Sequence, residues 1–174
     1  GTIKADASGM TITVTGTNWT NDGTLWANTG TLTTAGSWSS SGASDLIQVD
    51  ATGTLNLGGT FTTSAISGNV TRATGSTVNL VNTLDLATGS YDLGAAGNIG
   101  SLVLLNNAAV QNGTLLTTNA TSATLASFAN VTFTGVTLGN GTANSGNVTA
   151  NNGADLFIGS GGLDLNAGKI TLND

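Results

Sequence analysis

The chain has 174 residues, a net charge of −6 and only 7% charged residues, against roughly 25% in an ordinary soluble protein. Its three cations, Lys4, Arg72 and Lys169, cannot neutralise a phosphate track, which excludes a nucleic-acid partner, and the lack of cysteine excludes disulfides and thiol chemistry. No apolar run approaches the about 20 residues of a membrane-spanning helix, whereas leucine, valine and isoleucine recur too often for a disordered chain.

The beginning of the chain predicts a strand. Met10, Ile12 and Val14 alternate with threonine, which is the two-residue period of a strand with one buried face. Residues 1–20 lack the basic start and apolar core of a signal peptide, so we expect a mature, excised or recombinant chain. Of the whole sequence, this segment fits the repeat that follows it least well.

A repeat of 23 residues begins at Gly30. The stretches that start at residues 30, 53 and 76 align without gaps. A threonine, an aliphatic residue and a large apolar residue recur at a spacing of 23: Thr31, Thr54 and Thr77; Leu32, Leu55 and Val78; Trp38, Phe61 and Leu84. Three columns with one spacing indicate a repeat architecture rather than biased composition.

The repeat continues with slippage towards the end of the chain. Apolar residues again lie 23 apart at Leu102, Leu125 and Val148, and at Val110, Phe133 and Leu156. Between the two blocks the step is 24 residues from Val78 to Leu102 and 26 residues from Leu84 to Val110. We therefore place a small insertion near Gly94–Gly100.

Short alternating apolar segments, punctuated by glycine and asparagine, predict strands rather than helices. With a fixed period, the prediction is an all-β fold, a right-handed parallel β-helix (β-solenoid) of about 23 residues per coil and seven to eight coils, as a single domain over residues 1–174. At about 4.8 Å per coil the rod is about 35 Å long. A β-sandwich or jelly roll also has short strands and glycine-rich turns, but it predicts no fixed period.

In this fold each column becomes a stack along the axis. The columns that begin at Leu32 and Trp38 are expected to form core stacks, and the column that begins at Thr31 a hydroxyl ladder. Asn56 and Asn79 are expected to form an amide ladder. Four glycines are expected at corners that need a positive φ: Gly53, Gly59, Gly75 and Gly89.

The texture of the repeat, as in the segment GTLNLGGTF at 53–61, resembles the repeat regions of filamentous-haemagglutinin-like adhesins and autotransporter passenger domains of bacteria. The resemblance covers nearly the whole chain. It implies export, a cell-surface location and a role in adhesion, biofilms or fibres, and it assigns no catalytic residues. The secretion domain of two-partner haemagglutinins carries Asn-Pro motifs, and this chain has no proline, so the resemblance implies a shaft portion.

Catalysis would have to depend on aspartate pairs. Pectin-degrading enzymes share the β-helix fold, but their chemistry needs clustered aspartate with Arg, Lys or His, and this chain has no histidine. The candidate pairs for acid–base chemistry are Asp85 with Asp92 and Asp45 with Asp50. We expect these residues to cap turns instead, and we therefore predict no enzyme activity and no cofactor.

Two further ligand classes have weak signals. The segment Gly159–Leu165 partly resembles a calcium β-roll repeat, with Asp164 as a weak candidate metal ligand, but it occurs once and a glycine-rich corner is expected. Thr-x-Thr pairs, such as Thr11/Thr13, Thr31/Thr33 and Thr60/Thr62, would bind ice if they formed a flat face in regular register.

Three tryptophans lie near the beginning of the chain. Trp38 falls in an inner column of the repeat and is expected in the core. Trp19 and Trp26 could stack on sugars if exposed together, or could cover the open end of the first coil, which would otherwise present unpaired backbone.

The sequence thus predicts a structural or adhesive segment of a larger secreted or bacterial surface protein, or a self-assembling fibre subunit. The expected partners are another copy of the chain, stacked end to end, neighbouring repeats, and host or matrix glycans. Two alternatives stay open: a carbohydrate-binding or carbohydrate-processing β-helix, and an ice-binding solenoid.

Overall fold

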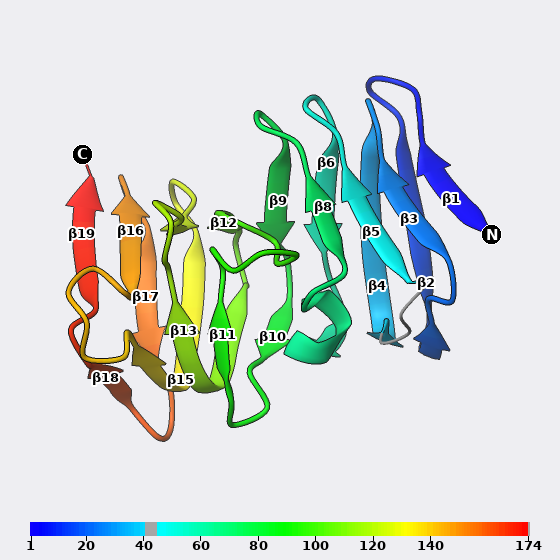
Figure 1. The fold of residues 1–174 in the computed structure, drawn as a ribbon. Helices are drawn as coiled ribbons and strands as arrows, with labels where there is room; N and C mark the ends of the chain where they lie inside the picture. Colours follow the sequence, from blue (N-terminus) through cyan, green and yellow to red (C-terminus); the bar gives the residue numbers. More distant parts are fainter. Residues whose placement is uncertain (41–44, 174) are drawn as a thin grey trace.

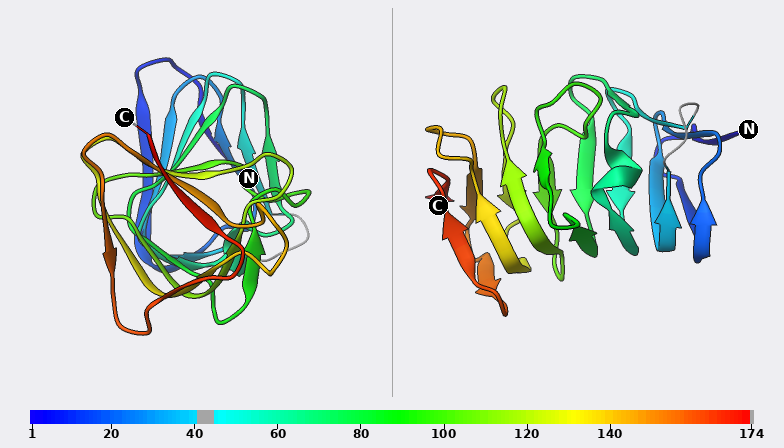
Figure 2. Two further views of the ribbon diagram at one scale, coloured as in Figure 1. Left: turned by 90° about the vertical axis from the view of Figure 1, so that its left-hand side faces the viewer. Right: turned by 60° about the horizontal axis from the view of Figure 1, so that its bottom comes forward.

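The structure is a computed structural model that describes residues 1–40 and 45–173. They form a parallel β-solenoid of about seven turns with a spacing near 23 residues, which confirms the fold predicted from the repeat. The two termini lie at opposite ends of the stack (Figure 1), and successive coils superpose in the view along the axis (Figure 2). All described strand pairs are parallel, whereas a β-sandwich or jelly roll is built from antiparallel pairs.

Three sheets form the wall of the solenoid. Sheet A contains β1 (Thr2–Ala5), β3 (Thr24–Ala27), β5 (Leu46–Val49) and β8 (Val70–Arg72). Sheet B runs the full length and contains β2 (Thr11–Thr20), β4 (Thr31–Ser39), β6 (Thr54–Leu57), β9 (Thr77–Leu80), β12 (Leu102–Leu104), β14 (Ala123–Leu125), β16 (Asn147–Asn151) and β19 (Lys169–Asn173).

Sheet C continues from sheet B around a corner. It contains β7 (Thr60–Thr62), β10 (Thr83–Asp85), β13 (Ala109–Leu116), β15 (Asn130–Leu138) and β17 (Asp155–Ile158), and β4 joins it at Ser37. β11 (Ser90–Asp92) pairs with the second half of β13, and β18 (Leu163–Leu165) with the second half of β15. A short 3-10 helix, η1 (Thr63–Ile66), follows β7.

The alternation of side chains fixes which residues fill the interior. In β6, Leu55 and Leu57 are buried, while Thr54 and Asn56 face outward and are half-buried. Leu32, Leu55 and Val78 lie opposite one another on successive coils, and each is fully buried. Residues of one face therefore stack on the same face of the next coil, which is the arrangement that a period-2 strand in a parallel ladder requires.

The aromatic column has the same geometry. Trp38 stacks on Phe61 with ring centroids 4.8 Å apart, and Phe61 lies opposite Leu84 in the ladder. All three side chains are buried. Trp38 also donates a hydrogen bond from Nε1 to the carbonyl oxygen of Gly58 on the next coil (2.9 Å), so its one polar group is satisfied inside the core.

The polar ladders differ in their hydrogen bonding. Asn79 Nδ2 donates to Asn56 Oδ1 (2.8 Å), and Asn56 Nδ2 donates to Thr33 Oγ1 (3.2 Å). Thr31, Thr54 and Thr77 are aligned on successive coils, but the described hydrogen bonds join none of their hydroxyls to one another. The amide ladder is thus bonded along the axis, and the threonine column is aligned only.

Two of the columns predicted for the second half are wrong by two residues. Leu102 lies opposite Ala123, not Leu125, and Ala123 lies opposite Val148. Phe133 lies opposite Ile158, not Leu156. The coils there vary in length because their corners differ, and a slip of two residues keeps every side chain on its own face. The apolar pattern alone therefore could not reveal the error.

The insertion is only partly where the sequence placed it. Asn79 pairs with Val103, and Thr83 pairs with Ala109. One extra residue therefore lies before Val103, and the other two lie in the corner between Val103 and Ala109.

Glycine is required at corners for two different reasons. Gly59 and Gly75 have positive φ, of 75° and 90°, as predicted. Gly53 and Gly89 do not, and that part of the prediction is wrong. At Gly53 a Cβ atom would lie 2.2 Å from the carbonyl oxygen of Ala27, so close approach of the neighbouring coil, not backbone conformation, requires glycine there.

Candidate functional site

The two end coils expose the ends of the internal columns. Of the large apolar side chains that the structure describes as exposed, all but Phe128 belong to the first or last coils: Ile3, Met10, Phe157, Ile158, Leu165 and Leu172. Leu172 is 80% exposed although it continues an inward-facing column, since it lies opposite the buried Ala150. The edges of β2 and β19 have no further strand beside them among the described residues.

Trp19 covers the first coil of the aromatic column. It is half-buried, its ring stacks on Trp38 at 5.5 Å, and its Nε1 donates to the carbonyl oxygen of Ala35 (2.9 Å). A shallow groove of about 340 Å³ runs beside this stack and includes Asn18 and Asp85. Trp38 and Phe61 are buried, so neither ring offers an open face for a sugar, and Trp19 is the half-buried end of this core stack.

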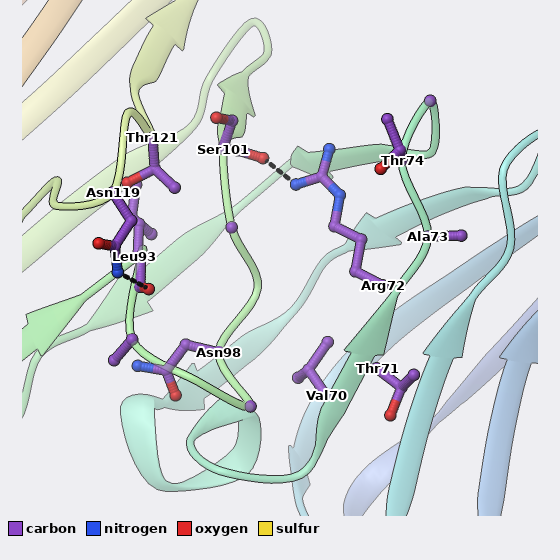
Figure 3. A pocket seen from close by; sticks show the side chains of 15 residues that line it. Val70, Thr71, Arg72, Ala73, Thr74, Leu93, Asn98, Ser101, Asn119 and Thr121 are labelled. Carbon is purple, nitrogen blue, oxygen red and sulfur yellow. Dashed lines mark hydrogen bonds between the residues drawn. The ribbon is translucent and has the colours of Figure 1, made fainter.

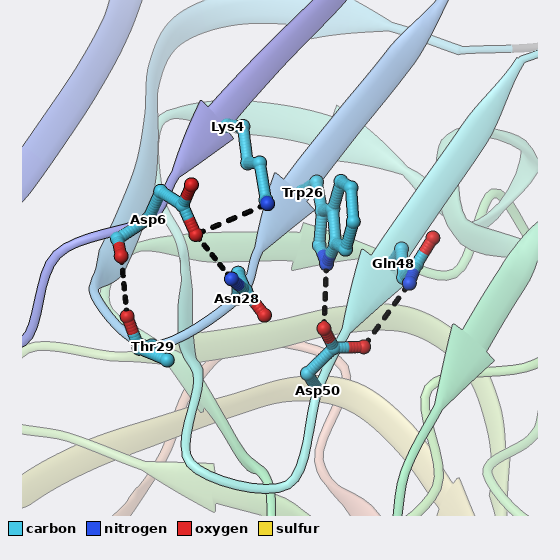
Figure 4. Close-up of polar contacts among 7 residues, drawn as sticks. All are labelled: Lys4, Asp6, Trp26, Asn28, Thr29, Gln48 and Asp50. Carbon is cyan, nitrogen blue, oxygen red and sulfur yellow. Dashed lines mark hydrogen bonds and ion pairs between the residues drawn. The ribbon is translucent and has the colours of Figure 1, made fainter.

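Trp26 lies on the side of the rod and does not cover its end, so that suggestion from the sequence is wrong. Its ring stands on the outer face of sheet A between Lys4 and Gln48 (Figure 4), and Lys4 Nζ lies 4.0 Å from the ring centroid. Trp26 Nε1 and Gln48 Nε2 both donate to the carboxylate of Asp50, at 2.9 and 3.0 Å. Lys4 also pairs with Asp6 at 3.0 Å.

This lateral cluster joins three coils. Lys4, Trp26 and Gln48 occupy matching positions on β1, β3 and β5. Hydrogen bonds from Asn28 and Lys4 lower the pKa of Asp6. Because Lys4 covers one face of the Trp26 ring, the cluster serves as a link between coils rather than as an open binding platform.

A groove of about 570 Å³ lies where sheet A stops (Figure 3). The coil that follows β8 has turns rather than a strand over residues 93–100. Arg72, the last residue of β8, bridges the gap: its Nη1 donates to the carbonyl oxygens of Ile99 (2.8 Å) and Ser101 (2.5 Å), and its Nε and Nη2 donate to Ser76. The guanidinium thus replaces hydrogen bonds that a fifth strand of sheet A would make.

Arg72 carries the charge of this groove. Burial lowers the pKa of Arg72, but arginine titrates far above neutrality and the group stays cationic. Among the described residues no carboxylate lies within 4.0 Å of it. The remaining polar side chains of the groove are neutral: Thr71, Thr74, Asn98, Ser101, Asn119 and Thr121.

The structure does not bring the candidate carboxylate pairs together. Asp85 and Asp92 lie beside Gln111 and Leu116 of β13, on either side of its bend at Asn112 and Gly113.

Each of the two carboxylates is occupied within a turn. The backbone N–H of Ala87 donates to Asp85 and that of Gly94 to Asp92, two residues on in each case, which are Asx turns. Hydrogen bonds from the Ala87 backbone, Gln111 and Asn112 outweigh partial burial and lower the pKa of Asp85, which suits a structural carboxylate better than a general acid.

The second pair is also separated. Asp45 is buried just before β5, whereas Asp50 follows β5 on the outer face and is bonded to Trp26. Asp50 is five positions after Asp45, and on a strand of period two an odd separation places the two side chains on opposite faces.

The calcium and ice candidates are placed as follows. Asp164 is exposed on β18, and within residues 1–40 and 45–173 no group of three potential metal-binding side chains gathers. The segment 159–162 closes a turn through the Gly162 N–H and the Gly159 carbonyl.

The Thr-x-Thr pairs of β2 and β4 are aligned, but the next two coils continue with Asn56 and Asn79, so the paired-threonine register covers only two coils.

The groove beside Arg72 was missed in the sequence. A signal was present, because Arg72 is the sole arginine of a chain with few charges and the irregular Gly94–Gly100 segment follows one period later. The repeat could not show, however, that sheet A ends at that point.

Comparisons with models of protein families, with curated proteins and with solved structures found no match. In the described parts of the chain, no helix has the length and apolar character needed to cross a bilayer. The fold and its surfaces are therefore the basis for a functional proposal.

Proposed function

We propose that this chain is a structural and adhesive segment at a bacterial cell surface, a rod that extends by stacking head to tail with a second copy of itself. The observation that carries the proposal is that the internal columns end exposed at both ends of the solenoid. The low charge, the threonine- and asparagine-rich repeat and the resemblance to adhesin shafts support an extracellular location. The proposal includes no catalytic step.

The two ends have matching chemistry in sheet B. Ile12 and Val14 face inward on β2, the first strand of the sheet, and Ile170 and Leu172 face inward on β19, the last. If β2 of a second copy continues the ladder, Ile12 covers Ile170 and Val14 covers Leu172. The outward residues then include Thr13 opposite Thr171.

Sheet C is offset by one coil at this contact. Ile158 ends the aromatic and aliphatic column and is 48% exposed, and Trp19 begins that column in the first coil. Because β17 lies one coil below β19 and Trp19 lies on β2 itself, one coil position of sheet C stays open between Ile158 of one copy and Trp19 of the other. The apolar contact is therefore that of Ile12 and Val14 with Ile170 and Leu172. Burying such apolar side chains contributes about 1.5–3 kcal/mol each when complete, and the new ladder also satisfies free backbone groups on both edges.

Cysteine cross-linking tests the proposed register. The chain has no cysteine, so the double variant Thr13→Cys/Thr171→Cys has one thiol at each end. Opposed residues in a parallel ladder lie about 4.8 Å apart, within the Cα–Cα range of a disulfide. Under mild oxidation we expect a series of covalent multimers on a non-reducing gel.

Two controls separate this contact from others. Each single-cysteine variant can form only dimers, which would report head-to-head or tail-to-tail contacts. The variant Thr13→Cys/Thr124→Cys keeps one end thiol but moves the other to the side of β14, about 10 Å from the end at the strand spacing, and should form no multimers. Equal multimer formation by this variant, or none by Thr13→Cys/Thr171→Cys, would contradict the proposal.

A further inference from the structure

We propose that the groove beside Arg72 binds the carboxylate of an acidic sugar unit, so that the side of the rod carries a glycan site. The groove belongs to a single chain, and this inference is independent of end-to-end assembly.

The first argument is charge. Charged side chains are rarely buried unless they are paired, and Arg72 is half-buried while the described residues offer it only neutral acceptors. Four of its five N–H groups are used, and one N–H of Nη2 remains. A carboxylate that accepts this hydrogen bond would supply the missing counter-charge, and charge-assisted bonds of this kind are about twice as strong as neutral ones.

The second argument is the lining. The hydroxyls of Thr71 and Thr74 have no hydrogen-bond partner among the described residues. Thr74 lies on the rim of the groove near the Arg72 guanidinium, whereas the Thr71 side chain points away from it (Figure 3). Small apolar surfaces come from Ala73 and Ala95. Hydroxyls and small apolar patches around one cation suit a sugar ring with one carboxylate. The groove volume lies within the about 300–1,000 Å³ of small-ligand sites.

The charge count also favours a monoanion. The lining has one cation, and the other two cations of the chain, Lys4 and Lys169, are not part of it. A phosphate or sulfate dianion would therefore leave one negative charge without a partner in a chain of net charge −6.

NMR titration of the full chain tests the site directly. Because Arg72 is the only arginine, its Nε–H gives a single assignable signal. We expect this signal and the backbone amides of residues 97–101 to shift saturably with glucuronate at fixed ionic strength, and not with glucose. No saturable shift would overturn the proposal, and sulfate binding as tightly as glucuronate would reduce the site to an adventitious ion only.

A charge placed on the rim provides a variant that keeps the fold. Thr74 is exposed in a turn and makes none of the hydrogen bonds of Arg72, so Thr74→Asp repels an anion without removing the bridge. We expect it to weaken glucuronate binding about fivefold, because two like charges within one groove repel each other at an intermediate dielectric.

The matched control is Asn152→Asp. Asn152 and Thr74 occupy the same position in similar turns. The N–H of Ala154 donates to the carbonyl oxygen of Asn151, and the N–H of Ser76 donates to that of Ala73. The variant Asn152→Asp therefore adds the same charge in a similar turn three coils away. We expect less than a twofold change. Equal binding by wild type and Thr74→Asp, or equal loss in both variants, would overturn the site.

Discussion

Neighbouring residues of β6 allow a sharp test of which face of the strand is inside. Leu55 is fully buried between Leu32 and Val78, whereas Asn56 faces outward and is half-buried. Leu55→Ala removes three buried carbon groups, worth about 0.8 kcal/mol each. The strands on either side hold their spacing, so the cavity cannot close and adds to the loss. We expect the free energy of unfolding to fall by about 3–4 kcal/mol.

Asn56→Ala is the matched control on the same strand. It removes two half-buried links of the amide ladder, and an intramolecular hydrogen bond contributes about 0.5–1.5 kcal/mol, so we expect a loss of about 1–2 kcal/mol. Urea unfolding followed by tryptophan fluorescence measures both, compared at equal m values. A larger loss for Asn56→Ala than for Leu55→Ala would refute the reasoning, because a shift of one residue exchanges the two faces.

Other positions give independent predictions. Gly59→Ala should lower the free energy of unfolding by more than about 2 kcal/mol, because φ is 75° and the new Cβ would lie 1.9 Å from the carbonyl oxygen of Gly36. Gly68→Ala has a similar φ of 78° but open space around the new Cβ, and should cost only about 1–2 kcal/mol. Equal losses for the two variants in thermal unfolding would contradict this prediction. Burial raises the pKa of Tyr91, whose hydroxyl donates to the carbonyl oxygen of Ile66 (2.8 Å). The folded chain therefore keeps a proton that the unfolded chain releases near pH 10, and the free energy of unfolding should fall as pH rises above about 10. Absorbance near 295 nm reports this single tyrosine, and ionisation near pH 10 in the native protein would disprove the prediction.

Much of the fold could be predicted because its physical cause is local and repeated. The alternation in Leu55 and Leu57 and the spacing to Val78 are set by the strand period and by coil length, and both are visible in the letters. The predicted alignment was wrong at Leu125 and Leu156, because corners of different length shift the register of the strands there by two residues. Such a shift leaves an apolar residue on the inner face, and only the three-dimensional pairing distinguishes the two registers.

The candidate sites were less predictable. The Asx turns of Asp85 and Asp92 follow from local chemistry and were expected. The role of Arg72 depends on the end of sheet A on one side of the solenoid. The repeat pattern predicts strands and could not show that sheet A ends there. Trp26 was also misplaced, because its alternation with the buried Leu25 and Ala27 shows that it faces outward but not which neighbours lie beside it.

Sedimentation velocity over a range of concentrations, with electron microscopy of the same samples, tests the central claim of head-to-tail assembly most directly. Leu172→Asp changes an apolar side chain that is 80% exposed at the end of the rod, and Phe128→Asp changes one that is 75% exposed on its side. The account predicts filaments of uniform width for wild type and Phe128→Asp, and monomers for Leu172→Asp. Short monomeric rods of wild type at every concentration would contradict it.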